Sequence, residues 1–144
     1  MLSKVKGELM LIRLVITVFW STKSLPNNSF AISTESAARL GSVTDPTKLA
    51  LVFERFAIQT VFHAAAYKHV PLMEKNPYEA VKINIVGTQV LAELAAENGV
   101  DKFVMVSTDK AVNPTNVMGA TKRFAEMYTQ SMNQLEGVRT KFIA

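Results

Sequence analysis

The short run Ser107–Lys110 holds three groups that can do chemistry. Thr108 supplies a hydroxyl, Asp109 a carboxyl group and Lys110 an amine, at consecutive positions. Such a set can orient a substrate through hydrogen bonds and move protons by general acid–base catalysis. That work requires a raised pKa for an aspartic acid donor and a lowered pKa for a lysine base. The alternative is a structural turn, in which Asp109 caps backbone amides and Lys110 is solvated.

A second pair, Met118 and Lys122, is separated by four positions, so both side chains lie on one face if the segment is helical. Taken alone, Met118 is typical of a core and Lys122 of a helix surface. The chain has no cysteine, and its two histidines are His63 and His69. These counts exclude a thiolate zinc site, a cysteine nucleophile and a histidine-rich metal site, so we predict no metal.

The elements that must position these groups alternate along the chain. Apolar runs predict buried strands over 59–66 and 103–107, and a third strand begins near the C-terminus. Between them we expect a loop over 67–76, a helix from Asn76 to about 98, and a helix from Asn116 to about 134, with a further short helix over 47–56. This order indicates an α/β fold with a partial Rossmann-like, doubly wound parallel sheet. Ligands of such sheets bind at the carboxyl ends of the strands, where 63–69 and 107–110 lie.

Composition narrows the class of protein. The chain has 144 residues, 49% of them hydrophobic, and a formal net charge of +4. This allows one domain with a core, and the absence of a basic stripe argues against nucleic-acid binding. The apolar stretch Leu9–Trp20 is too short to span a bilayer and contains Arg13, so we expect a buried strand or helix of a soluble, cytoplasmic domain. The alternative is a fragment tethered to a membrane by this stretch.

The glycines do not form a phosphate-binding loop. No two of the six are close enough for G-x-G-x-x-G or for a Walker A loop; they stand at Gly7, Gly41, Gly87, Gly99, Gly119 and Gly137. The chain therefore either does not bind a dinucleotide in the standard way or does not carry the segment that does.

Five strings taken together resemble one family. They are GSVTD (41–45), VFHAAAYKHVPLMEKNP (61–77), NIVGT (84–88), VMVSTDKAVNPTNVMGATK (104–122) and RFAEM (123–127). Their order and spacing are similar to those of the CapD-like polysaccharide biosynthesis proteins, which are extended short-chain dehydrogenase/reductases. The resemblance implies that 41–144 is the central part of an NAD(P)-binding Rossmann-like domain, whereas 1–40 matches poorly. It also implies that the Gly-rich first βα unit and the C-terminal substrate lobe are missing.

The resemblance implies roles for individual residues. Thr108 would hold the sugar C4 oxygen, Asp109 would be the acid at C6, and Lys110 the base at C5. Met118 stands where most of the wider superfamily has a tyrosine base, so the C4 deprotonation would pass to Asp109 or Lys122. Lys122 would also hydrogen-bond the nicotinamide ribose.

The remaining implied residues bind rather than react. Those facing the cofactor, NAD or NADP, are Ser42, Val43, His63, Ala64, Ala65 and Ala66, together with Lys122. Those facing the substrate are Lys68 and Asn84.

By resemblance, the function is an NAD(P)-dependent 4,6-dehydratase of a UDP-sugar such as UDP-N-acetylglucosamine, in surface polysaccharide biosynthesis. The alternatives are a nucleotide-sugar 4-epimerase of the same family and a non-catalytic fragment. Without a Gly-rich loop to hold the pyrophosphate, we expect this chain alone to be inactive or impaired. Pairing of two copies through the two long helices is also expected from the resemblance.

Overall fold

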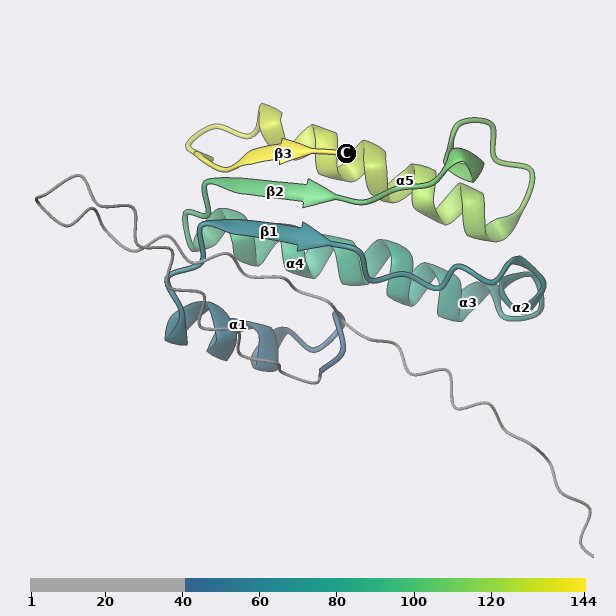
Figure 1. Ribbon diagram of the computed structural model, residues 1–144, viewed down its shortest axis with the longest axis horizontal. Helices are drawn as coiled ribbons and strands as arrows, with labels where there is room; N and C mark the ends of the chain where they lie inside the picture. Colours follow the sequence, from purple (N-terminus) through teal and green to yellow (C-terminus); the bar gives the residue numbers. More distant parts are fainter. Residues whose placement is uncertain (1–40) are drawn as a thin grey trace, which may run out of the picture.

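The computed structural model describes residues 41–144, and its centre is a parallel three-stranded sheet (Figure 1). The strands lie in the order β1-β2-β3 and span Thr60–His63, Lys102–Met105 and Lys141–Ile143. All three predicted strands are confirmed, and so is their parallel pairing. The predictions for Leu9–Trp20 and the rest of 1–40 fall outside the described residues.

The helices pack on one face of the sheet. Figure 1 shows α4 and α5 running side by side behind the strands, with α1 next to α4. Both crossovers step in the same direction, and right-handed crossovers then place their helices on the same face. The described part is thus one half of a doubly wound sheet. The helical segments are α1 (Pro46–Arg55), α2 (Val70–Lys75), α3 (Pro77–Ala80), the π-turn η1 (Val81–Val86), α4 (Gly87–Glu97), the 3-10 turn η2 (Asp109–Ala111), α5 (Val117–Ser131) and the 3-10 turn η3 (Met132–Gln134).

The core forms between this sheet face and the helices. Val61, Phe103 and Phe142 are register partners on the three strands, and all three side chains are buried. Leu91 and Ala95 of α4 cover them. Burying a large apolar side chain contributes about 1.5–3 kcal/mol, so this layer holds the strand ends in place.

The prediction of a loop over 67–76 is wrong, because the chain forms the short helix α2 there. Pro71 lies in the first turn of α2, where its missing N–H costs nothing. Met73 is buried in a cluster with Met118 of α5. Tertiary packing therefore stabilises a helix that is too short to show a periodic pattern in the sequence.

The predicted helix from Asn76 to about 98 exists, but it is interrupted. Asn76 occupies the N-cap position of α3, yet its side chain caps nothing and donates instead to the carbonyl of Leu72. The π-turn then adds one residue to a helical turn and separates α3 from α4. Asn84 lies within it and is buried.

The predicted start of α5 at Asn116 is confirmed, and α1 begins at a similar side-chain cap. Asn116 caps α5, since its Oδ1 accepts from the backbone N of Gly119 at 2.8 Å. Asp45 caps α1 through Lys48 N at 3.0 Å. After η3 the chain turns at Gly137, whose φ of 80° is readily adopted only by glycine.

The outer side of β3 is occupied by a side chain. Asn133 donates from Nδ2 to the carbonyl of Phe142 and accepts at Oδ1 from its N–H, both at 2.9 Å. One amide group thereby satisfies both backbone groups that Phe142 presents on the side away from β2.

Candidate functional site

The carboxyl ends of β1 and β2 lie side by side. His63 pairs with Met105, and Val106 N donates to the His63 carbonyl at 2.9 Å. The two segments that follow, 64–69 and 107–110, therefore start from adjacent points (Figure 1). This confirms the predicted juxtaposition of the two strand ends.

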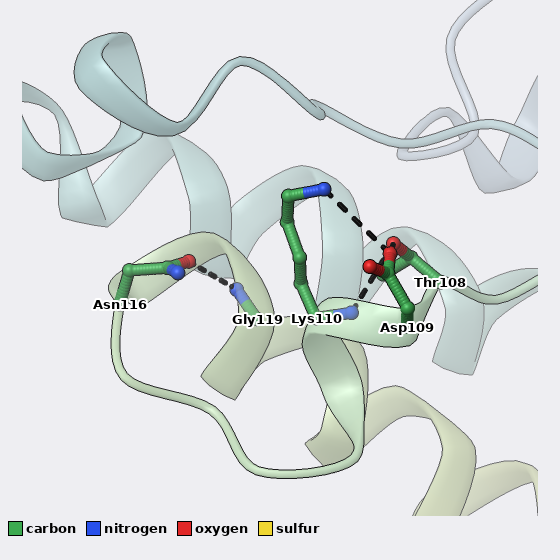
Figure 2. A network of polar contacts seen from close by, with 5 residues as sticks. All are labelled: Thr108, Asp109, Lys110, Asn116 and Gly119. Atoms are coloured by element: carbon green, nitrogen blue, oxygen red, sulfur yellow. Dashed lines mark hydrogen bonds and ion pairs between the residues drawn. The ribbon is translucent and has the colours of Figure 1, made fainter.

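The turn after β2 holds Thr108, Asp109 and Lys110 close together. Figure 2 shows Thr108 at the N-cap of η2, where its Oγ1 accepts from Lys110 N at 3.4 Å and donates to Asp109 Oδ1 at 2.9 Å. Lys110 Nζ lies 3.6 Å from the same carboxylate. In the alternative interpretation Asp109 caps this turn, whereas in the structure Thr108 is the capping residue.

Asp109 is ionised in the free chain, whereas a general acid must carry a proton. The hydrogen bond from Thr108, and then the charge of Lys110, lower the pKa of Asp109 below its usual value. Both side chains are open to water, with 88% of Asp109 and 51% of Lys110 exposed. In the free chain Asp109 is therefore a carboxylate.

Gly119 lets this turn pack against α5. A side chain at Gly119 would overlap the backbone carbonyl of Lys110. Nearby, Glu74 of α2 accepts from Val117 N at 2.6 Å. Neither contact was found from the sequence, although a glycine in the first turn of a helix was a signal for close packing.

Lys122 reaches back from α5 to the end of β2. Only 6% of it is exposed, and its Nζ donates to the Val106 carbonyl at 2.9 Å. Burial lowers its pKa, partly opposed by the charge of Glu126. Lys122 is thus not a surface lysine. Residues 41–144 provide one acceptor for its three N–H groups.

Met118 lies one turn before Lys122 and is 2% exposed. It packs with Met73 and Ala80 of the neighbouring helices. The structure therefore places it in the core. Met118 stands where most of the wider superfamily has a tyrosine base. That the C4 deprotonation therefore passes to another residue stays a prediction.

The alanines after β1 are not equivalent. Ala64 is exposed, Ala66 is half-buried, and Ala65 is buried in a small cluster with Val43 and Ile83. Ala64 and Ala66 therefore present the accessible methyl groups at this strand end, next to the start of the Ser107–Lys110 turn.

Ser42 and Val43 differ in exposure, since the side chain of Ser42 is exposed and that of Val43 is buried. Ser42 is exposed, and its hydroxyl hydrogen-bonds Thr44 Oγ1 at 2.8 Å. Val43 is 3% exposed, and a side chain at Gly87 would overlap it. The side chain of Val43 is therefore a packing element, and Ser42 is the one that can reach a ligand.

Both amide hydrogens of Asn84 are used within the protein. Its Oδ1 accepts from Tyr67 N at 2.8 Å, and its Nδ2 donates to Tyr67 O at 3.1 Å and to Thr121 Oγ1 at 3.0 Å. This leaves it no hydrogen for a sugar, and we assign it to hold the segment after β1. Lys68 in that segment is exposed.

His63 is buried beneath these segments. Its Nε2 lies 2.8 Å from Thr88 Oγ1, while its Nδ1 has no hydrogen-bond partner within residues 41–144. Burial, together with the charge of Lys122, lowers the pKa of His63 to about 3. The histidine is thus neutral, and Thr88 and Thr121 are site residues that sequence reasoning missed.

The fold defines a class. Residues 41–144 have the partial Rossmann fold of solved nucleotide-sugar epimerases and dehydratases. The UDP-glucose 4-epimerase of Thermotoga maritima, solved with UDP-glucose, is similar with a TM-score of 0.66 and 25% identity over 79% of this chain and 43% of that one. Other solved proteins with this fold hold NAD.

The family follows from the sequence comparisons. The family of polysaccharide biosynthesis proteins matches residues 14–144, and the chain belongs to it. It is 55% identical over 105 residues to the capsular polysaccharide biosynthesis protein CapD of Staphylococcus aureus, covering 73% of this chain. It is 42% identical over 98 residues to an inverting UDP-N-acetylglucosamine 4,6-dehydratase of Campylobacter jejuni, covering 68% of this chain. The chain spans only 17% of the first relative and 29% of the second.

Two further results concern metals and membranes. Residues 41–144 contain no group of three side chains able to hold a metal ion. Within the same range, no helix combines the length and apolarity that a membrane span requires.

Proposed function

We propose that this chain forms the part of an NAD(P)-dependent UDP-sugar 4,6-dehydratase that brings the nicotinamide ribose and the reacting sugar carbons together. The observation that carries the proposal is the buried Lys122, whose Nζ is anchored on Val106 next to the Thr108–Lys110 turn. The relatives named as polysaccharide biosynthesis proteins and as a dehydratase support it.

The residues present fit one end of NAD(P). Lys122 has two N–H donors without a partner in residues 41–144 that could serve ribose hydroxyls, and Ala64 offers a small exposed side chain where the cofactor would lie close to the backbone. The described residues contain no Gly-rich turn for the pyrophosphate. When bound, the nicotinamide would accept a hydride from the sugar and return it.

The chain's own groups would handle the protons. Thr108 would hold the C4 oxygen. A neutral Lys110 would remove the C5 proton and return it to C5 when the hydride goes back to C6. Asp109 would take the C4 hydroxyl proton as the hydride leaves C4, and would then give that proton to the departing C6 hydroxyl, which leaves as water. The last role requires a higher pKa than Asp109 has in the free chain. A sugar that covers Asp109 and separates it from Lys110 would raise this pKa by desolvation and by loss of the charge pair.

The acid and base at the turn favour dehydration over epimerisation. A 4-epimerase moves a hydride and the proton of one hydroxyl, and it does not need to break the C5–H or C6–O bonds. Dehydration needs an additional acid–base pair for those bonds. Asp109 and Lys110, 3.6 Å apart beside Thr108, supply such a pair.

The test uses both the chain itself and a chimera, in which residues 41–144 replace the matching segment of the Campylobacter jejuni dehydratase. Incubation with UDP-N-acetylglucosamine and NAD+ should give a 4-keto product that has lost one water. We expect this from the chimera, and little or none from the chain alone. A product of unchanged mass, epimerised at C4, would favour the epimerase.

Matched lysine variants make the test specific. Lys122→Met in the chimera should lower product formation by about 100-fold, because the hydrogen bonds that position the nicotinamide ribose are lost. Lys82→Met removes an exposed lysine on η1 and should have no effect. Equal activities of the two variants would refute the assignment of Lys122.

We also propose that two copies associate through α5 and the neighbouring η1. Phe124 and Met127 are 53% and 56% exposed on α5, and Tyr78 and Val81 are exposed on the elements beside it. Large exposed apolar groups gathered on adjacent elements are typical of protein–protein contacts. Sedimentation should show a dimer that Phe124→Glu converts to a monomer, and an unchanged monomeric parent would exclude this pairing.

A further inference from the structure

Three buried polar residues connect β1 to the segment that follows it, by a route outside the backbone. His63 points from β1 toward α4, where its Nε2 lies 2.8 Å from Thr88 Oγ1. Thr88 Oγ1 in turn donates to the Asn84 carbonyl at 2.7 Å. Each of the three residues is 1% exposed, so water does not compete for these bonds.

The hydroxyl of Thr88 fixes the tautomer of His63. A hydroxyl has one proton, and that of Thr88 is given to the Asn84 carbonyl. Its oxygen must therefore accept from the imidazole, so the proton of neutral His63 is on Nε2. Nδ1 is then a bare acceptor, which agrees with its lack of a donor within the described residues.

This series of hydrogen bonds continues through Asn84 to the backbone of the segment after β1. The Asn84 carbonyl belongs to the π-turn, where the regular ladder of helical hydrogen bonds is interrupted. The Asn84 side chain holds both the N–H and the carbonyl of Tyr67. Tyr67 lies in the segment 64–68, which carries the exposed Ala64 and Lys68.

We propose that His63 and Thr88 are positioning residues, which fix the π-turn so that Asn84 holds segment 64–68 in the place needed for the cofactor. Both side chains are buried and would act on the cofactor through Asn84 and Tyr67. The link to the cofactor rests on the proposed function, whereas the link to Tyr67 does not.

The test measures amide hydrogen exchange at Tyr67 in the 144-residue chain. Thr88→Val keeps the shape of the side chain and removes the hydroxyl. We expect exchange of the Tyr67 amide to become about tenfold faster, corresponding to loss of a buried hydrogen bond. Exchange of the β2 amides should stay unchanged, since it reports on the sheet.

Two comparisons separate this role from general destabilisation. Thr129→Val also removes a fully buried hydroxyl, one that contacts Met105 Sδ at 3.4 Å, and it should leave Tyr67 exchange unchanged. His63→Gln retains an N–H donor for Thr88 and should behave like the parent, whereas His63→Leu should behave like Thr88→Val. If the His63→Leu variant does not fold, Tyr67 exchange in Thr88→Val still tests the positioning role.

A titration with NADH, followed by fluorescence, tests the link to the cofactor. Thr88→Val should weaken NADH binding by about threefold to tenfold, and Thr129→Val should not. Unchanged Tyr67 exchange in Thr88→Val would overturn the proposal, and so would faster exchange with the parent's affinity for NADH. If the parent binds no NADH, the proposed function fails for this chain, and the exchange data decide the positioning role alone.

Discussion

Acid should destabilise this protein through a single buried histidine. An unfolded chain protonates His63 near the ordinary pKa of 6.5, whereas burial lowers the pKa in the folded state to about 3. Between these values the unfolded state binds one more proton than the folded state. The stabilising contribution of neutral His63 is therefore complete above pH 6.5 and is lost as the pH falls toward 3.

The size of the effect follows from the two pKa values. A difference of one pKa unit corresponds to about 1.4 kcal/mol, so lowering the pH from 7.5 to 4.5 removes roughly 3 kcal/mol of the free energy of unfolding. This is a large part of the total stability of a small domain.

Urea unfolding at pH 7.5, 6.5, 5.5 and 4.5 measures this loss. The His63→Gln variant should lack this contribution and show a shallower dependence, and the difference between the two proteins isolates His63 from the carboxylates that both contain. His69→Gln removes the exposed histidine and should retain the parental slope. Equal slopes for the parent and His63→Gln would refute the reasoning, as would an imidazole NMR signal of His63 that titrates near pH 6.

Three further substitutions test packing at the site, each followed by urea unfolding. Gly119→Ala should cost about 1–3 kcal/mol, because its methyl group overlaps the Lys110 carbonyl; a fully stable variant would show that the turn can move away. Gly87→Ala should be destabilising alone and partly rescued by Val43→Ala, with a coupling energy of about 1 kcal/mol or more; simple additivity would contradict the predicted overlap. Glu74→Ala should cost about 0.5–2 kcal/mol by removing the acceptor for Val117 N, whereas Glu136→Ala, at an exposed position, serves as a neutral control.

Local sequence patterns predicted the elements that are stabilised by local chemistry. The β-branched and apolar runs predicted β1 and β2 because each packs one face on the core. Asn116 marked the start of α5, since an N-cap acts within three residues. The juxtaposition of the strand ends followed from the parallel order alone.

The features that could not be predicted depend on contacts between distant positions. Asn84 reaches Tyr67 across 17 positions and Thr121 across 37, and no periodic pattern encodes such pairs. The same holds for α2, which depends on burial of Met73 against Met118. The burial of Lys122 was also hidden, because lysines on helices are ordinarily exposed.

The pairing of Asn133 with Phe142 bears on how this sheet resists aggregation. The border of a sheet ordinarily offers unpaired N–H and carbonyl groups that can template the addition of a foreign chain. Within residues 41–144, β3 is an outer strand, and one asparagine imitates a single residue of an adjoining strand and already satisfies the N–H and carbonyl of Phe142. Any intruding strand must first displace this amide and break two hydrogen bonds, each contributing about 0.5–1.5 kcal/mol. A short asparagine can thus protect the border of a sheet where a charged residue or a proline is commonly found.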